Sequence, residues 1–425
     1  MSAIIRNSPY PKKIITALIG VGLILFFVNR IFLGIALFGL AAAAMFLPVI
    51  SKDRCQGLTR RDWLLISMAM GFPVLYLVRM VLSDFDFRLL DRVSRILLII
   101  PVYLVVRCFG ISIKTIFLSC AFGVFFAGID AFFQILQGQT RVRGMSVNNS
   151  IPFGNFSLLF GFISFLSVYW LQEDRARPYI FFLATMSLAT GIFVSFASGS
   201  RGGWIAIPIF LAILGFAGKK GFPLWRYTSL LTMLLLAVLF VPSINGRVAQ
   251  GVADVNAYLA HQGPWTQGDA ISSLDSRLDM WAAGLAGFKS SPFMGLGFGD
   301  EYKEFLKNRV DLGLSHPTIF SHRHLHSEII TTAARLGLVG IASLLILLVG
   351  GLRWFTSGPM RKDGEAKIIS SLGLMVIASM IIFPMTDSMF GTTLHPMLYA
   401  ALIGLAAGAL RHHELSTKAE LPGVG

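Results

Sequence analysis

Long apolar runs separated by short polar stretches dominate the chain. A helix needs about 20 apolar residues to cross the hydrocarbon core of a bilayer. Runs of about this length predict about twelve membrane-spanning helices, over residues 14–28, 31–50, 63–82, 93–109, 111–136, 153–171, 179–198, 204–218, 225–242, 328–352, 368–385 and 394–410. The pattern therefore predicts an all-α, polytopic membrane protein.

The largest polar stretch lies between the ninth and tenth predicted spans. It divides the chain into nine spans (1–242), a loop (243–327), three spans (328–410) and a short tail (411–425). A connection of this length is too long for a passive link between helices. We therefore expect the loop to carry part of the functional site.

The second half of this loop has helical periodicity. Leu278, Trp281, Leu285 and Phe288 recur at helical spacing. This spacing predicts an amphipathic helix over residues 275–290, lying near the membrane surface.

Composition supports the membrane assignment and excludes a soluble enzyme. Only 14% of the residues are charged and 55% are hydrophobic, whereas a soluble domain carries about 25% charge. The net charge of +14 could indicate a nucleic-acid partner. Lys and Arg collect on every second loop, which places them on one side of the membrane. The positive-inside rule and contact with anionic lipid therefore explain the net charge better than a nucleic-acid partner does. Both termini are predicted to be cytoplasmic, with the large loop on the periplasmic side.

Arg201 breaks this charge pattern because it is predicted on the outer side. It follows Ser200 and precedes Gly202, in a run of small residues from Ala197 to Gly203. Backbone N–H groups between glycines can form a nest for an anion. The alternative is an arginine that ends a helix and extends to the headgroups. We favour the anion site.

Three further arginines are predicted on the same side. Arg277 is expected in the first turn of the surface helix, after an N-cap at Ser276 or Asp275, where a cation opposes the helix dipole. This predicts a partner for Arg277, either Asp279 or a bound anion. Arg141 and Arg143 form a weaker candidate, since phospholipid headgroups explain them almost as well.

A histidine-rich run precedes the tenth span. His322, His324 and His326 lie within five residues, which could indicate a metal site. Arg323 stands where a zinc protease motif has glutamate, and a cation would repel a metal. A neutral imidazole at the membrane surface can instead accept a proton from a hydroxyl. A third alternative is a polar cap at the helix end. We predict acid–base chemistry and no metal.

Asp387 completes the set of candidates at the end of the eleventh span. Carboxylates in or beside a membrane are functional candidates by default, and Asp387 could also orient an arginine or a histidine. The chain has no Gly-x-x-x-x-Gly-Lys-Ser/Thr phosphate loop. Energy is therefore expected to arrive with the substrate, without ATP or another cofactor.

Three motifs resemble the O-antigen ligase and polymerase superfamily of bacterial envelope proteins. His326-Ser327, nine residues and Gly337-Leu338-Val339-Gly340 resemble its His-[Asn/Ser/Gln]-x9-Gly-x-x-Gly signature. The run from Ser198 to Trp204 resembles the arginine motif before its large outer loop. Within the loop, its Arg-x3-Trp and Pro-x2-Gly-x-Gly patterns resemble positions Arg277, Trp281, Pro292, Gly295, Gly297 and Gly299.

The resemblance implies a specific activity. Such ligases transfer a glycan from undecaprenyl pyrophosphate to a sugar hydroxyl of lipid A–core at the periplasmic face of the inner membrane. It implies that Arg201 and Arg277 stabilise the pyrophosphate and that His326 is the general base. Arg141, Arg143, His324, Asp387, Ser200 and Gly202 are then expected to bind or orient substrate.

Two other functions remain open. A polymerase of the same superfamily uses the same donor, and the His326 spacing favours the ligase. A transporter would also have many helices, but it should have internal repeats and charges at mid-bilayer. Nothing in the sequence demands a partner subunit, so a monomer is compatible with it.

Overall fold

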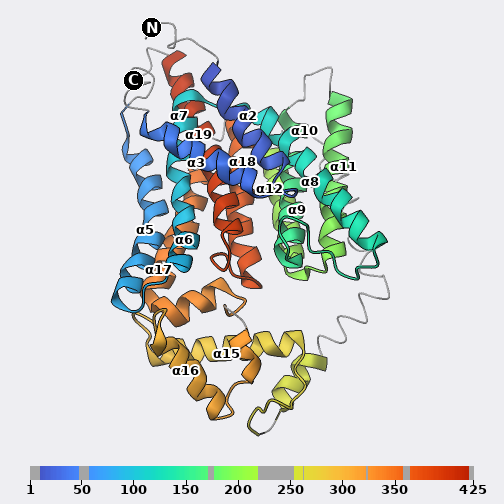
Figure 1. The fold of residues 1–425 in the computed structure, drawn as a ribbon. Coiled ribbons are helices and arrows are strands. Elements are labelled where there is room, and N and C mark those ends of the chain that lie inside the picture. Colours follow the sequence, from blue (N-terminus) through green and yellow to red (C-terminus); the bar gives the residue numbers. More distant parts are fainter. Residues whose placement is uncertain are drawn as a thin grey trace.

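The computed structural model describes residues 10–46, 57–170, 177–218, 253–261, 263–321, 324–357 and 364–420. Over these residues all regular structure is helical, as predicted. Seven helical stretches are long and apolar enough to cross a membrane: Arg60–Leu82, Ile113–Leu136, Ser150–Tyr169, Pro178–Ser198, Glu328–Thr356, Gly364–Met385 and Leu394–Thr417. Each coincides with a predicted span. The chain is therefore an all-α membrane protein (Figure 1).

Four of the other predicted spans are shorter or interrupted. α2 (Tyr10–Ile24) and α3 (Ile31–Met45) have 15 residues each, about 22 Å of helix. The predicted span 93–109 is divided between α6 (Phe87–Ser94), η1 (Arg95–Leu98) and α7 (Ile99–Phe109). The span 204–218 starts as the 3-10 helix η2 (Arg201–Ile205) and continues as α12 (Ala206–Ala217). The span 225–242 lies outside the described residues.

The long helices form one bundle. α9 (Ser150–Phe165), α18 (Gly364–Ile382) and α19 (Leu394–Glu420) lie in its interior, where nearly all their apolar residues are buried. α5 (Arg60–Leu82), α8 (Ile113–Leu136), α11 (Arg177–Ser198) and α17 (Glu328–Thr356) are more exposed. Large hydrophobic side chains on these helices face outward, as expected where lipid is the solvent.

A charged network ties the bundle together at the end where α5 begins and α19 finishes. Asp62 is fully buried, pairs with Arg107 and Arg411 at 3.2 Å each, and accepts a hydrogen bond from Tyr103. Glu414 pairs with Arg411 at 3.0 Å. These ion pairs join α5, α7 and α19.

At the opposite end of the bundle, residues 263–321 form a separate layer that we call the loop segment. Figure 1 shows α15 (Ser273–Ser290) and α16 (Asp300–Asp311) lying across this end. A small apolar core, including Met280, Leu296 and Leu306, holds the layer together. We call this end of the bundle the loop end.

α15 is the predicted surface helix with two corrections. Its N-cap is Ser272, which forms a capping box with Asp275, so Arg277 lies in the second turn and the predicted first-turn position is wrong. The buried residues of α15 include Met280, Ala283 and Gly287, whereas Leu285 is 49% exposed. Small side chains allow α15 to pack closely on α17, and this contact decides which face is buried.

A break in α17 attaches the loop segment to the bundle. Gly337 has φ +63° inside α17, a conformation that favours glycine. The carbonyls of Ala334 and Arg335 then accept from the N–H groups of Leu296 and Gly297 at 2.9 and 3.0 Å. In return, Leu338 N–H donates to the Pro292 carbonyl at 2.8 Å. The glycines that carry the family resemblance thus form a backbone junction.

Candidate active site

Arginines from three parts of the chain meet in one cavity at the loop end. The cavity has a volume of about 460 Å³. Five of the predicted site residues line it, and its full lining comprises Arg141, Ile151, Gly199, Ser200, Arg201, Gly202, Asp254, Ser273, Leu274, Arg277 and Thr386. We call it the arginine cavity.

The turn that carries Arg201 is built from small residues. α11 ends at Ser198, Gly199 adopts φ +68°, and η2 starts at Arg201. The Ser200 hydroxyl donates to Asn155 Oδ1 at 2.8 Å in the buried interior. A Cβ atom at Gly202 would overlap the side chain of Thr386. The turn is therefore fixed against α9 and against the segment after α18.

Arg141 enters the same cavity from the segment after α8. Its Nε donates to the Ser198 carbonyl at 2.8 Å, which links it to the Arg201 turn. Arg143 is not brought into the cavity lining: its side chain is exposed, and its backbone N–H donates to Gln134 Oε1 at 3.0 Å. Asp130 holds this segment through the Met145 N–H at 2.6 Å.

Arg277 reaches the cavity from α15 in the loop segment. Burial lowers its pKa, and the negative charge of Asp387 acts in the opposite direction. An arginine nevertheless remains protonated at neutral pH. Asp279, the alternative partner from the sequence, accepts from the His316 N–H at 3.0 Å. Asp387 is therefore the carboxylate whose charge acts on Arg277.

His324, His326 and Asp387 form a cluster beside the cavity. One donor atom from each lies within 4.8 Å of the others. His326 has φ +48°, and its N–H donates to His324 Nδ1 at 3.4 Å. Thr386, which lines the arginine cavity, directly precedes Asp387. His322 and Arg323 lie outside the described residues.

Asp387 is buried and its protonation is perturbed. The side chain is 4% exposed, and Ser388 N–H donates to its Oδ1 at 2.9 Å. Burial raises the pKa of Asp387 to about 6, against the lowering effects of the Ser388 hydrogen bond and of Arg277, while Glu328 raises it further. Asp387 therefore titrates near neutral pH, where a proton acceptor is useful.

Two residues at this site were missed by the sequence reasoning. Glu328 accepts a hydrogen bond from Ser388 Oγ at 2.8 Å. His395 on α19 places Nε2 3.7 Å from Asp387 Oδ2, and it is 1% exposed. Both are polar residues at the start of a spanning helix, and that position was the signal that could have identified them.

The histidine and carboxylate cluster offers a donor set that zinc accepts. The nearby positive charge of Arg277 opposes a cation there. The same three groups also suit proton transfer, because a carboxylate beside an imidazole stabilises the imidazolium. A metal-free site therefore stays a prediction, and chelation tests it.

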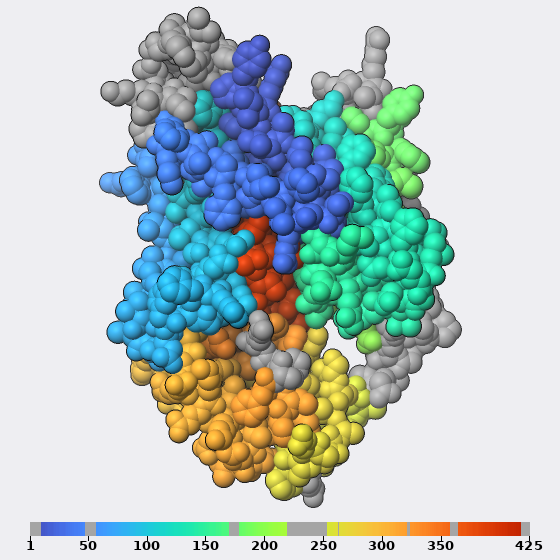
Figure 2. Space-filling view, in the orientation of Figure 1, coloured from blue at the N-terminus to red at the C-terminus, as the bar shows by residue number. Residues whose placement is uncertain are grey.

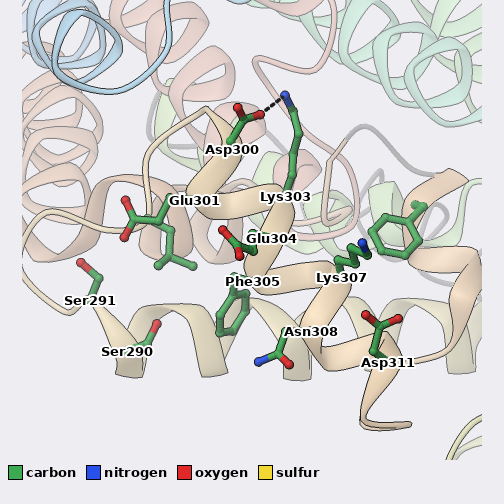
Figure 3. A pocket seen from close by; sticks show the side chains of 12 residues that line it. Ser290, Ser291, Asp300, Glu301, Lys303, Glu304, Phe305, Lys307, Asn308 and Asp311 are labelled. Atoms are coloured by element: carbon green, nitrogen blue, oxygen red, sulfur yellow. Dashed lines mark hydrogen bonds and ion pairs between the residues drawn. The ribbon is translucent and has the colours of Figure 1, made fainter.

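A second, larger cavity of about 1210 Å³ lies in the loop segment. Figure 3 shows side chains that line it, among them Glu301, Glu304 and Phe305 of α16 and Ser290 at the end of α15. None of the predicted site residues lines it. Ser290 is about 20 Å along α15 from Arg277, so this cavity is separate from the arginine cavity, which we take as the candidate active site.

The fold and the site define a polytopic, all-α membrane protein with an arginine-lined cavity next to a histidine and carboxylate cluster. Residues 184–345 match the family model described as O-Antigen ligase. This range contains Arg201, Arg277 and His326, whereas Arg141 and Asp387 lie outside it.

Two relatives are similar to the chain. The chain is 26% identical over 345 residues to an uncharacterized protein from Haemophilus influenzae, across 80% of this chain and 83% of that relative. It is also 26% identical over 204 residues to a protein named O-antigen ligase from Escherichia coli K12, across 45% of this chain and 44% of that relative. The chain is therefore similar to the O-antigen ligase superfamily, over residues 184–345 by the family model and over 204 residues by the named relative.

Proposed function

We propose that this protein is an O-antigen ligase. It transfers an O-antigen glycan from undecaprenyl pyrophosphate to a sugar hydroxyl of lipid A–core, at the periplasmic face of a bacterial inner membrane, with both termini in the cytoplasm. The observation that carries the proposal is the arginine cavity beside His326 and Asp387. It combines sites for a pyrophosphate and for a proton at one end of the bundle.

The arginines act on the donor. Arg201 and Arg277 face the pyrophosphate, with Arg141 beside them, and guanidinium groups bind phosphate oxygens through paired N–H donors. When the bond between the anomeric carbon and the pyrophosphate breaks, its electron pair stays on the leaving oxygen. Fixed positive charge stabilises this developing charge without a metal and without ATP.

His326 acts on the acceptor. Its neutral imidazole takes the proton of the sugar hydroxyl while the hydroxyl oxygen bonds to the anomeric carbon. Asp387, as a carboxylate, stabilises the resulting imidazolium, and His324 orients it. The proton then passes to water and undecaprenyl pyrophosphate leaves. A single direct displacement inverts the anomeric configuration.

The bundle offers a route for substrates that are anchored in lipid. Figure 2 shows a hollow on one face, where the red C-terminal helices are visible between the blue and the green parts of the chain. A hollow open to the side would admit the polyprenyl donor and the acceptor from the bilayer.

Purified protein in detergent tests the proposal. Lipid-linked glycan and lipid A–core are supplied without ATP, and glycan-bearing lipopolysaccharide is followed by gel for the wild type and for His326→Ala. Product from the wild type alone supports the ligase and an essential His326. Equal product from His326→Ala refutes the base assignment. Absence of product from the folded wild type refutes the ligase, and a second lipid-linked glycan as acceptor then tests the polymerase.

A further inference from the structure

Glu328 is a buried carboxylate that the proposed mechanism does not use. It is the first residue of α17 and is 3% exposed. Its Oε2 accepts from Ser388 Oγ at 2.8 Å and from the Phe390 N–H at 3.2 Å. Its Oε1 accepts from Thr332 Oγ1 at 3.3 Å. The three contacts hold both carboxyl oxygens of Glu328 in a fixed position.

These hydrogen bonds fix the segment between α18 and α19. Asp387 lies in this segment, next to Ser388, and Phe390 follows three residues later. Glu328 itself lies two residues after His326. Glu328 and Ser388 are 60 residues apart in the chain. The Glu328 side chain therefore joins the histidine segment to the distant Asp387 segment.

We propose that Glu328 is a positioning residue that holds Asp387 against His326 and Arg277. This inference rests on the proposed function. Its negative charge also belongs to the electrostatic balance of the site. Asp387 is faced by Arg277 from α15, His395 from α19, and His324 and His326 from the segment before α17.

Two substitutions separate position from charge. Glu328→Gln keeps a carbonyl oxygen for Ser388 and Phe390 but removes the charge. Because Glu328 raises the pKa of Asp387, the acidic limb of the pH–rate profile should move to lower pH. Glu328→Ala releases the segment. Misplacement of a reacting group by about 1 Å reduces turnover about 100-fold, so kcat should fall by this factor while KM for the donor changes little.

Amide hydrogen exchange gives a readout that does not depend on turnover. In Glu328→Ala the Phe390 N–H loses its acceptor, so peptides covering residues 388–391 should exchange faster than in the wild type. In Glu328→Gln they should exchange as in the wild type. Glu365→Gln is the matched control, since Glu365 lies in the first turn of the spanning helix α18, at the opposite end of the bundle. It should leave turnover, the pH profile and exchange unchanged.

The outcomes distinguish the two proposals. If the wild type transfers no glycan, the proposed function fails, while amide exchange still tests whether Glu328 fixes the segment. If the wild type is active and Glu328→Ala retains full turnover and normal exchange, the positioning role is refuted. If Glu328→Ala does not fold, the pH profile of Glu328→Gln decides, and an unmoved acidic limb overturns the inference.

Discussion

The buried Asp387 carboxylate should support glycan transfer but lower the free energy of unfolding at neutral pH. The Asp387→Asn variant tests both effects. The carboxyl group is buried, and its pKa rises from 3.8 to about 6. A raised pKa means that the folded protein binds the proton more tightly than the unfolded chain. The contribution of Asp387 to stability is therefore fully present below about pH 3.8 and is lost as the pH rises through about 6.

The size of the effect follows from the two pKa values. The difference between 3.8 and about 6, at about 1.4 kcal/mol per pH unit, amounts to about 3 kcal/mol. Asparagine is neutral at every pH and similar in shape. Asp387→Asn should therefore be more stable than the wild type by up to about 3 kcal/mol at pH 7.5, and equal to it at pH 3.5. Activity should fall in the same variant.

Unfolding in mixed detergent micelles, followed at both pH values, tests this expectation. Other groups titrate over the same range, but they are shared by both proteins and cancel in the difference between them. If the variant is no more stable than the wild type at pH 7.5, Asp387 is solvated well enough to ionise at its ordinary pKa. The assignment of Asp387 as a buried carboxyl group with a raised pKa would then be wrong.

Three other predictions concern the arginines, metal and the helix break. Arg201→Lys should lower kcat about 100-fold, since an ammonium group does not replace paired guanidinium donors, whereas Arg143→Lys should be near wild type; equal effects would remove the distinction between the two. EDTA should leave transfer unchanged, and a loss that added metal restores would establish a metal site. Gly337→Ala should lower the melting temperature in a thermal unfolding assay, because φ +63° with ψ −154° is a conformation almost restricted to glycine and costs alanine about 1–3 kcal/mol. Gly39→Ala, in open space, is its control.

The long spanning helices could be predicted because lipid demands an unbroken apolar run. The shorter helices could not, since hydropathy does not distinguish a full crossing from a partial one. Residues 31–50 illustrate this, because the run is apolar throughout but the helix ends at Met45. The break at Gly337 was also invisible, because its hydrogen-bond partners lie more than 35 residues away in the loop segment, at Pro292 and Gly297.

Charged residues at unexpected positions in the sequence identified candidates for the site, but the sequence did not show which residues interact with them. Arg277 was expected to have a partner, either Asp279, two residues along the chain, or a bound anion. In the structure the carboxylate whose charge acts on Arg277 is Asp387, more than 100 residues away. A single sequence does not reveal that Arg277 and Asp387 lie near each other, because this proximity depends on how α15 packs on α17. Glu328 and His395 were missed because each begins an apolar run and reads as part of it.

The charged residues that break the sequence pattern fall into two groups in the structure, according to where their side chains lie. Arg79 breaks the pattern as clearly as Arg201, but its guanidinium donates to the carbonyls of Met294 and Gly295 at 3.1 and 2.8 Å. Asp130 likewise accepts from a backbone N–H. These groups hold the loop segment and the Arg141 segment to the bundle. Arg201 and Arg277 line a cavity instead. The position of a charged residue, and not its rarity, therefore distinguishes the candidates: Arg79 and Asp130 hold segments to the bundle, whereas Arg141, Arg201 and Arg277 line the cavity.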